Sequence, residues 1–103
     1  MNWRAEAKAA LRLYPRARKK RASPGAGLTP REERALAAVD FALRMQRVYP
    51  NAEARLEMIR LVYFQRSKTL EGAAQACHYS RSTLLQWDTE LLTAVYAALQ
   101  LLR

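Results

Sequence analysis

The chain has 103 residues, one cysteine, one histidine and a formal net charge of +9. This length suits one small domain, and no uncharged apolar run approaches the roughly 18 residues needed to cross a bilayer. A single cysteine excludes an intramolecular disulfide, and the charged N-terminus lacks the apolar middle of a signal peptide, so we expect a cytoplasmic protein.

A short amphipathic helix is predicted at the start of the chain, over about residues 2–14. Apolar residues recur there at helical spacing: Trp3, Ala7, Ala10, Leu11 and Tyr14. Pro15 has no amide N–H to continue the helix, so we place its end there. The predicted N-terminal unit is therefore a helix within residues 1–14.

Positive charge is concentrated in the first third, where residues 1–34 hold ten Lys/Arg against three Asp/Glu. The stretch "PRARKKRASPGAG" adds proline and glycine to this charge, which predicts a flexible basic linker over residues 15–29. A basic segment of this kind favours a polyanionic partner, above all nucleic acid. A solvated, disordered tail is the alternative.

The next helix begins at a capping box. In "LTPREERAL", Thr29 and Glu32 can each accept a backbone N–H of the first turn, and Pro30 suits the first helical position. We expect this helix to run to about Tyr49 with a wide apolar arc.

A third helix is predicted from Ala52 to about Gln65, with Asn51 as its cap. Its apolar stripe consists of Leu56, Ile59, Val62 and Tyr63. No stretch shows sustained alternation of β-branched residues. The predicted fold is therefore all-α, a small helical bundle over residues 30–103 with a long final helix.

Within that bundle, residues 69–90 have the layout of a helix-turn-helix. Thr69 can cap the first helix, and Ser80 can cap the second, which begins at Arg81. His78 stands in the turn, where glycine is common and positive φ is required. The residues that face inward and fix the helix crossing are Ala73, Ala74, Cys77, Tyr79, Leu84 and Trp87.

The adjacent Cys77 and His78 are interpreted as packing around this turn. Neither has a second histidine or cysteine as a partner for metal binding, and neighbours at a helix end point in different directions. We therefore expect no enzyme activity, no metal and no cofactor.

The stretch from Leu56 to Leu99 resembles the C-terminal half of the phage RinA/ArpU-type transcriptional regulators, relatives of the helix-turn-helix of sigma factors. In it, "CHYSRSTLLQW" is similar to the family's "GYSxxTVxxW" core, with histidine in the glycine place. The resemblance implies a sequence-specific DNA-binding regulator, phage- or prophage-encoded and associated with the nucleoid. The alternatives are a phage terminase small subunit and a helical adaptor that contacts RNA polymerase.

In the DNA-binding interpretation, the start of the second motif helix enters the major groove of double-stranded DNA. The candidate base contacts are Arg81, Ser82, Leu85 and Gln86. The candidate phosphate contacts are Thr83, Lys68, Arg66, Arg16, Arg18, Lys19, Lys20 and Arg21. Asp88 and Glu90 follow closely and are expected to repel phosphate, which limits insertion to the first turns.

Two rows of apolar residues run along the final helix. One consists of Leu84, Leu91 and Ala98, and the other of Leu85, Leu92 and Leu99. A small domain does not easily cover both rows. The second row either packs on the helix that begins at Pro30 or forms a subunit contact, and we favour a homo-oligomer, a dimer or higher, through this helix.

Overall fold

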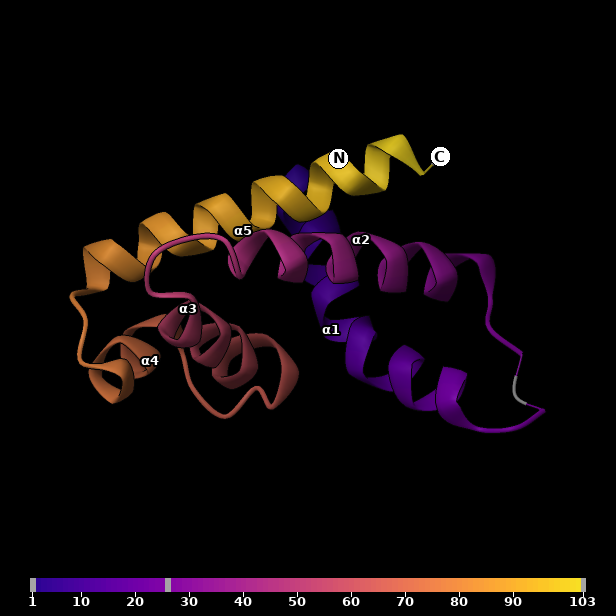
Figure 1. Cartoon of the computed structure of the whole chain (residues 1–103), viewed down its shortest axis with the longest axis horizontal. Coiled ribbons are helices and arrows are strands. Elements are labelled where there is room, and N and C mark those ends of the chain that lie inside the picture. Colours follow the sequence, from indigo (N-terminus) through magenta and orange to yellow (C-terminus); the bar gives the residue numbers. More distant parts are fainter. Residues whose placement is uncertain (1, 26, 103) are drawn as a thin grey trace.

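The computed structural model describes residues 2–25 and 27–102. These residues form five α-helices and one turn of π-helix, and they include no strand, which confirms the predicted all-α class (Figure 1). In chain order the elements are α1 (Trp3–Ala22), α2 (Pro30–Gln46), α3 (Ala52–Ile59), η1 (Arg60–Phe64), α4 (Leu70–Cys77) and α5 (Arg81–Leu101). α5 is the predicted long final helix.

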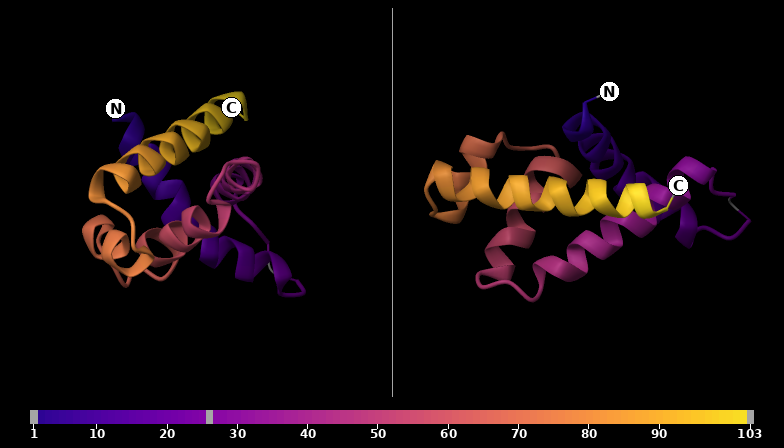
Figure 2. Two further views of the ribbon diagram at one scale, coloured as in Figure 1. Left: turned by 60° about the vertical axis from the view of Figure 1, so that its left-hand side comes forward. Right: turned by 90° about the horizontal axis from the view of Figure 1, so that it is seen from above.

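The three long helices share one hydrophobic core. Leu11 of α1, Val39 of α2 and Leu92 of α5 are all fully buried in it. α3, η1 and α4 pack together at one end, beside the first turns of α5 (Figures 1 and 2). The short helices therefore support the start of α5, and the long helices hold its remainder.

The predicted helix end at Pro15 is wrong, because α1 continues through this residue. Residues 15–22 are thus helical and do not form the predicted linker. Proline removes a backbone hydrogen bond, and its ring crowds the previous turn. Packing on both sides compensates, since Tyr14 stacks on Phe64 with ring centroids 5.2 Å apart and Ala17 is fully buried. α1 belongs to the same packed unit as α2 and α5.

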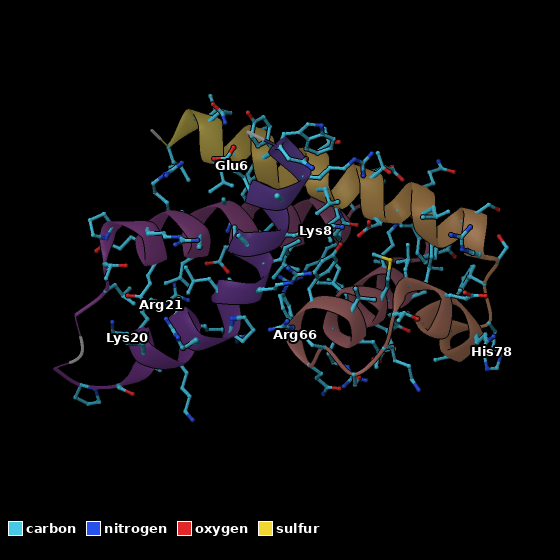
Figure 3. The ribbon with its side chains drawn as sticks, turned by 180° about the vertical axis from the view of Figure 1, so that it is seen from behind. Glu6, Lys8, Lys20, Arg21, Arg66 and His78 are labelled. Atoms are coloured by element: carbon cyan, nitrogen blue, oxygen red, sulfur yellow. The ribbon has the colours of Figure 1, made fainter. Side chains whose placement is uncertain are left out.

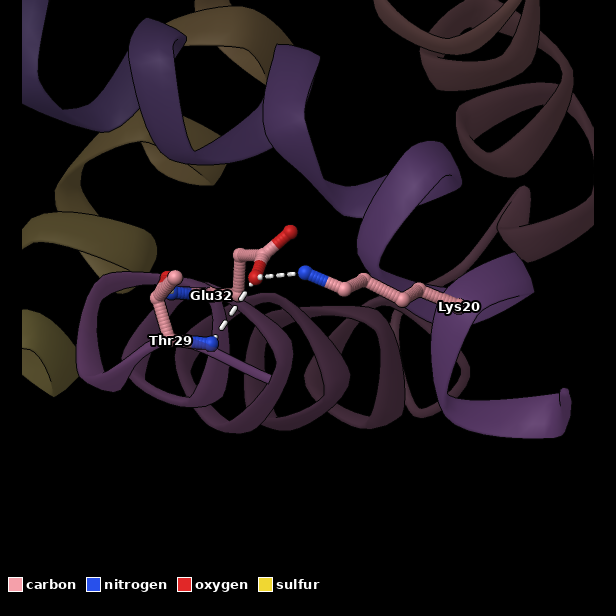
Figure 4. Close-up of polar contacts among 3 residues, drawn as sticks. All are labelled: Lys20, Thr29 and Glu32. Carbon is pink, nitrogen blue, oxygen red and sulfur yellow. Dashed lines mark hydrogen bonds and ion pairs between the residues drawn. The ribbon is translucent and has the colours of Figure 1, made fainter. Parts of the chain in front are cut away.

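The predicted capping box at the start of α2 is confirmed. Thr29 Oγ1 accepts the Glu32 N–H at 3.1 Å, and the Glu32 carboxylate accepts the Thr29 N–H at 2.8 Å. Lys20 of α1 donates to the same carboxylate at 3.0 Å (Figure 4). The Thr29 N–H first, and then Lys20, lower the pKa of Glu32 to about 2. One carboxylate therefore joins the end of α1 to the start of α2.

Two of the three other predicted caps are confirmed. Thr69 and Ser80 each accept a backbone N–H from the first turn of α4 and α5. Asn51 precedes α3 as expected, but its side chain makes no cap. Its backbone is left-handed with φ 63°, and its Oδ1 accepts the Tyr79 hydroxyl at 3.2 Å. Asn51 thus links the start of α3 to the helix-turn-helix.

Two helix ends differ from the sequence prediction. α2 ends at Gln46, short of Tyr49. The helix predicted over 52–65 changes from α to π at Arg60, where the Gln65 N–H donates to the Arg60 carbonyl at 2.8 Å. The wider turn rotates the following side chains relative to an uninterrupted α-helix.

The second apolar row of α5 is largely covered by the chain itself. Leu92 is fully buried and Leu99 is 8% exposed in the core shared with α2, while Leu85 is 39% exposed. The row therefore packs within the chain and offers no continuous surface for a subunit contact. None of the helices in residues 2–25 and 27–102 is long and apolar enough to span a membrane.

Candidate nucleic-acid interface

The turn between α4 and α5 has the conformation that its sequence predicts. His78 is left-handed with φ 61° and ψ 38°. The Tyr79 N–H donates to the Ala74 carbonyl at 3.0 Å, which closes the end of α4 as in a Schellman motif. Histidine meets a steric cost here that glycine avoids. The closed turn sets the direction in which α5 leaves α4.

The predicted motif core comes together around Trp87. Its fully packed members are Ala73, Ala74, Leu84 and Trp87, and its half-buried members are Cys77 and Tyr79. The ring of Tyr79 lies 4.8 Å from that of Trp87. Burial raises the pKa of the Cys77 thiol, which disfavours the reactive thiolate.

Asp88, which we expected to repel phosphate, points into the protein. Asp88 is 8% exposed, and its carboxylate accepts the Tyr63 hydroxyl of η1 at 2.5 Å. Burial, and then this hydrogen bond, raise the pKa of Tyr63. Glu90 also has an internal partner, since Arg55 lies 3.4 Å from its carboxylate. Both acidic residues of α5 are therefore used by the fold.

Arg55 is the residue of this region that the sequence analysis did not single out. Its side chain is 8% exposed, and its guanidinium lies 4.3 Å from the ring of Tyr49 and 5.0 Å from that of Trp87. Its hydrogen-bond acceptors are Gln46, Pro50 and Glu90. Its helical spacing from Met58 and Ile59, which are both buried, was the sequence signal that could have placed it on the inner face. Arg55 connects the end of α2 with the second and third turns of α5.

The four predicted base contacts are all exposed on the first two turns of α5: Arg81, Ser82, Leu85 and Gln86. Thr83, a predicted phosphate contact, is half-buried, and its hydroxyl lies 2.8 Å from that of Ser80. Asp88 is buried and Glu90 is paired with Arg55, so the exposed face of these first two turns has no carboxylate. It presents a guanidinium, an amide, a hydroxyl and an aliphatic side chain.

The structure divides the other predicted phosphate contacts into two groups. Arg66 and Lys68 are exposed in the loop before α4, while the remaining five lie on α1. In Figure 3, Lys20 and Arg21 lie at the opposite side of the molecule from His78, with Arg66 between them. The long axis of the molecule measures 42 Å. The end of α1 is therefore not beside the start of α5.

Two of the five α1 residues already have partners in the fold. Lys20 pairs with Glu32 at 3.0 Å, and Arg21 lies 3.6 Å from Asp40. The exposed remainder consists of Arg16, Arg18 and Lys19.

Fold and site together define a small all-α chain in which α4, a three-residue turn and the start of α5 form a helix-turn-helix. In the part of the chain that the structure describes, no three His, Cys, Asp or Glu side chains are grouped to hold a metal. Comparison with protein-family models, with curated proteins and with solved structures gave no match. The RinA/ArpU-type resemblance therefore stays a prediction.

Proposed function

We propose that the protein binds double-stranded DNA and reads a specific sequence with the first two turns of α5 in the major groove. One observation carries the proposal: the exposed face of these turns bears side chains suited to base contacts, while Asp88 is buried and Glu90, whose side chain is 30% exposed, is paired with Arg55. A polyanion can therefore approach this helix without meeting a carboxylate on that face.

The exposed groups match the edges of DNA bases. The guanidinium of Arg81 can donate twice to guanine, and the amide of Gln86 can both donate to and accept from adenine. Leu85, 39% exposed, is suited to apolar contact with a thymine methyl group. Each good bidentate pair discriminates against the wrong base by about 1–3 kcal/mol.

The start of α5 is held rigidly enough for such recognition. The Ser80 cap fixes its first turn, and Asp88 and Glu90 are bound by Tyr63 and Arg55. Base recognition needs side chains placed within a fraction of an ångström, which supporting contacts of this kind provide. Arg66 and Lys68, in the loop before α4, are the proposed phosphate contacts beside the groove.

Transcriptional control of phage genes is the biological role that we propose, on the strength of the RinA/ArpU-type resemblance. A single helix-turn-helix reads few base pairs, so we also propose that the protein acts as a homo-oligomer. An apolar groove between the second half of α2 and the end of α5, lined by Phe41, Leu101 and Leu102, supports this assembly.

Selection of bound sequences from a random DNA pool tests the proposal. We expect one enriched site, and fluorescence anisotropy should show that Arg81→Ala or Gln86→Ala reduces the preference for that site over random DNA by about 5-fold or more. Arg47→Ala, which removes an exposed charge at the end of α2, is the matched control and should keep the preference. Absence of an enriched site, with RNA polymerase retained on the protein, would favour the adaptor instead.

A further inference from the structure

We infer that the outer face of α1 is a second DNA-binding surface, which holds a phosphodiester backbone outside the base pairs read by α5. Four cations form this surface, the α1 ridge: Lys8, Arg12, Arg16 and Lys19. They recur every three or four residues, so they share one face of the helix and span about 17 Å at 1.5 Å per residue.

The ridge cations are available for an external partner. Arg12, Arg16 and Lys19 are exposed and Lys8 is half-buried, and none of the four forms an ion pair with another described residue. The only acidic residue of α1 is Glu6, which is half-buried and lines a neighbouring groove with Arg34 and Leu99. The fully exposed charged side chains of α1 are therefore all basic.

Positive charge continues on both flanks of the ridge. On one side, a groove between α1 and the start of α2 is lined by Arg12, Arg16 and Arg31. On the other side, a groove between α1 and η1 is lined by Arg18, Lys19 and Arg60. Among the residues that the structure describes, Glu32 is the only acid that lines either groove, and its carboxylate already accepts hydrogen bonds from Lys20 and Thr29. Arg60 is itself paired with Glu57, so the cations that an extended polyanion can meet along α1 come chiefly from α1 and the start of α2.

The composition of this face favours a nucleic acid over an anionic membrane. A helix that binds at a membrane surface exposes large apolar side chains that enter the lipid. In α1 no large apolar side chain among the described residues is exposed, since Leu11 and Tyr14 are buried and Trp3 and Leu13 are half-buried against the core. Beside the ridge, Ala5 is exposed, and Ala9 and Leu13 are half-buried in the groove that Arg12 and Arg16 line.

The ridge lies apart from the helix-turn-helix. In Figure 3, Lys8 marks the middle of the molecule and Lys20 one side, whereas His78 lies at the opposite side. The 42 Å length of the molecule equals the rise of about 12 base pairs of duplex. DNA that follows the ridge therefore lies beyond the bases at Arg81 and Gln86. The inference deepens the proposed function, since it adds a second contact with the same polymer.

A double variant, Arg12→Gln/Arg16→Gln, tests the ridge. Its binding is measured by fluorescence anisotropy on a random-sequence duplex of about 40 base pairs, which at about 3.4 Å per base pair is longer than the protein. We expect weaker binding and a slope of log affinity against log salt that is smaller by about 1.8, since each released phosphate contact contributes about 0.9. The matched control is Arg44→Gln/Arg47→Gln, which removes the same charge from exposed residues in the last turn of α2 and directly after it. This control should leave the slope unchanged.

Equal slopes for the two double variants would overturn the inference. So would binding to phosphatidylserine vesicles that only the ridge variant loses, if DNA binding stays intact. Thermal unfolding of both double variants should match that of the wild type, because all four substituted arginine side chains are exposed. The result also separates the two proposals: unchanged site preference in Arg81→Ala and Gln86→Ala refutes recognition by α5, whereas the salt slope of the ridge variant is independent of sequence.

Discussion

Removal of one hydroxyl group, by Tyr63→Phe, tests how the recognition turns of α5 are held. The phenol is 3% exposed and donates at 2.5 Å to the Asp88 carboxylate, which is 8% exposed. Phenylalanine keeps the packing but leaves this carboxylate without the donor. Hydrogen bonds to charged groups contribute about 1.5–3 kcal/mol, so we expect a loss of about 2–3 kcal/mol in the free energy of unfolding.

Tyr14→Phe is the matched control, because it removes an equally short bond, 2.5 Å to Asp40. The Asp40 side chain is 29% exposed and also lies 3.6 Å from Arg21, so water and a cation remain to solvate it. We expect a loss of about 1 kcal/mol or less for this variant. Urea unfolding followed by circular dichroism measures both values. Equal losses would refute the view that burial of Asp88 decides the effect.

Three further predictions concern the core, the cap and the motif. Leu92→Glu should unfold the chain, because the site is fully buried and burial of an unpaired carboxylate costs several kcal/mol. Val48→Glu, at 82% exposure, should change stability by less than about 0.5 kcal/mol, and circular dichroism distinguishes the two outcomes. Glu32→Gln should remove a pH-dependent contribution to stability that the wild type has in full above pH 4.5 and loses as the pH falls towards about 2, since folding lowers this pKa; unfolding curves across that range report it. Trp87→Ala should cost about 3–5 kcal/mol in thermal unfolding, and a loss below about 1 kcal/mol would contradict its place in the motif core.

The features predicted correctly from the sequence depend on residues within one or two helical turns. The capping box of Thr29 and Glu32, the Ser80 cap and the left-handed His78 are all of this kind. The helical continuation through Pro15 is different, because Phe64, on which the neighbouring Tyr14 stacks, lies about fifty residues further along the chain. A local pattern cannot include such a contact.

The same limit applies to the candidate site. Helical periodicity correctly placed Arg81 and Gln86 on the exposed face of α5. It could not assign partners to Asp88 and Glu90, because Tyr63 and Arg55 are 25 and 35 residues distant in sequence. The sequence showed carboxylates near the recognition turns, but only the tertiary structure showed that they pair with Tyr63 and Arg55.

The exposure of the base-facing side chains has a consequence for how this protein can change. In the described residues, the side chains of Arg81, Leu85 and Gln86 form no hydrogen bond or ion pair within the fold, whereas Trp87 and Asp88 beside them are buried. Substitutions at the first three positions alter what the helix recognises and leave the frame that supports it intact. Binding preference and folding can thus evolve separately on one helix, and a library randomised at these positions is a direct route to variants with new targets.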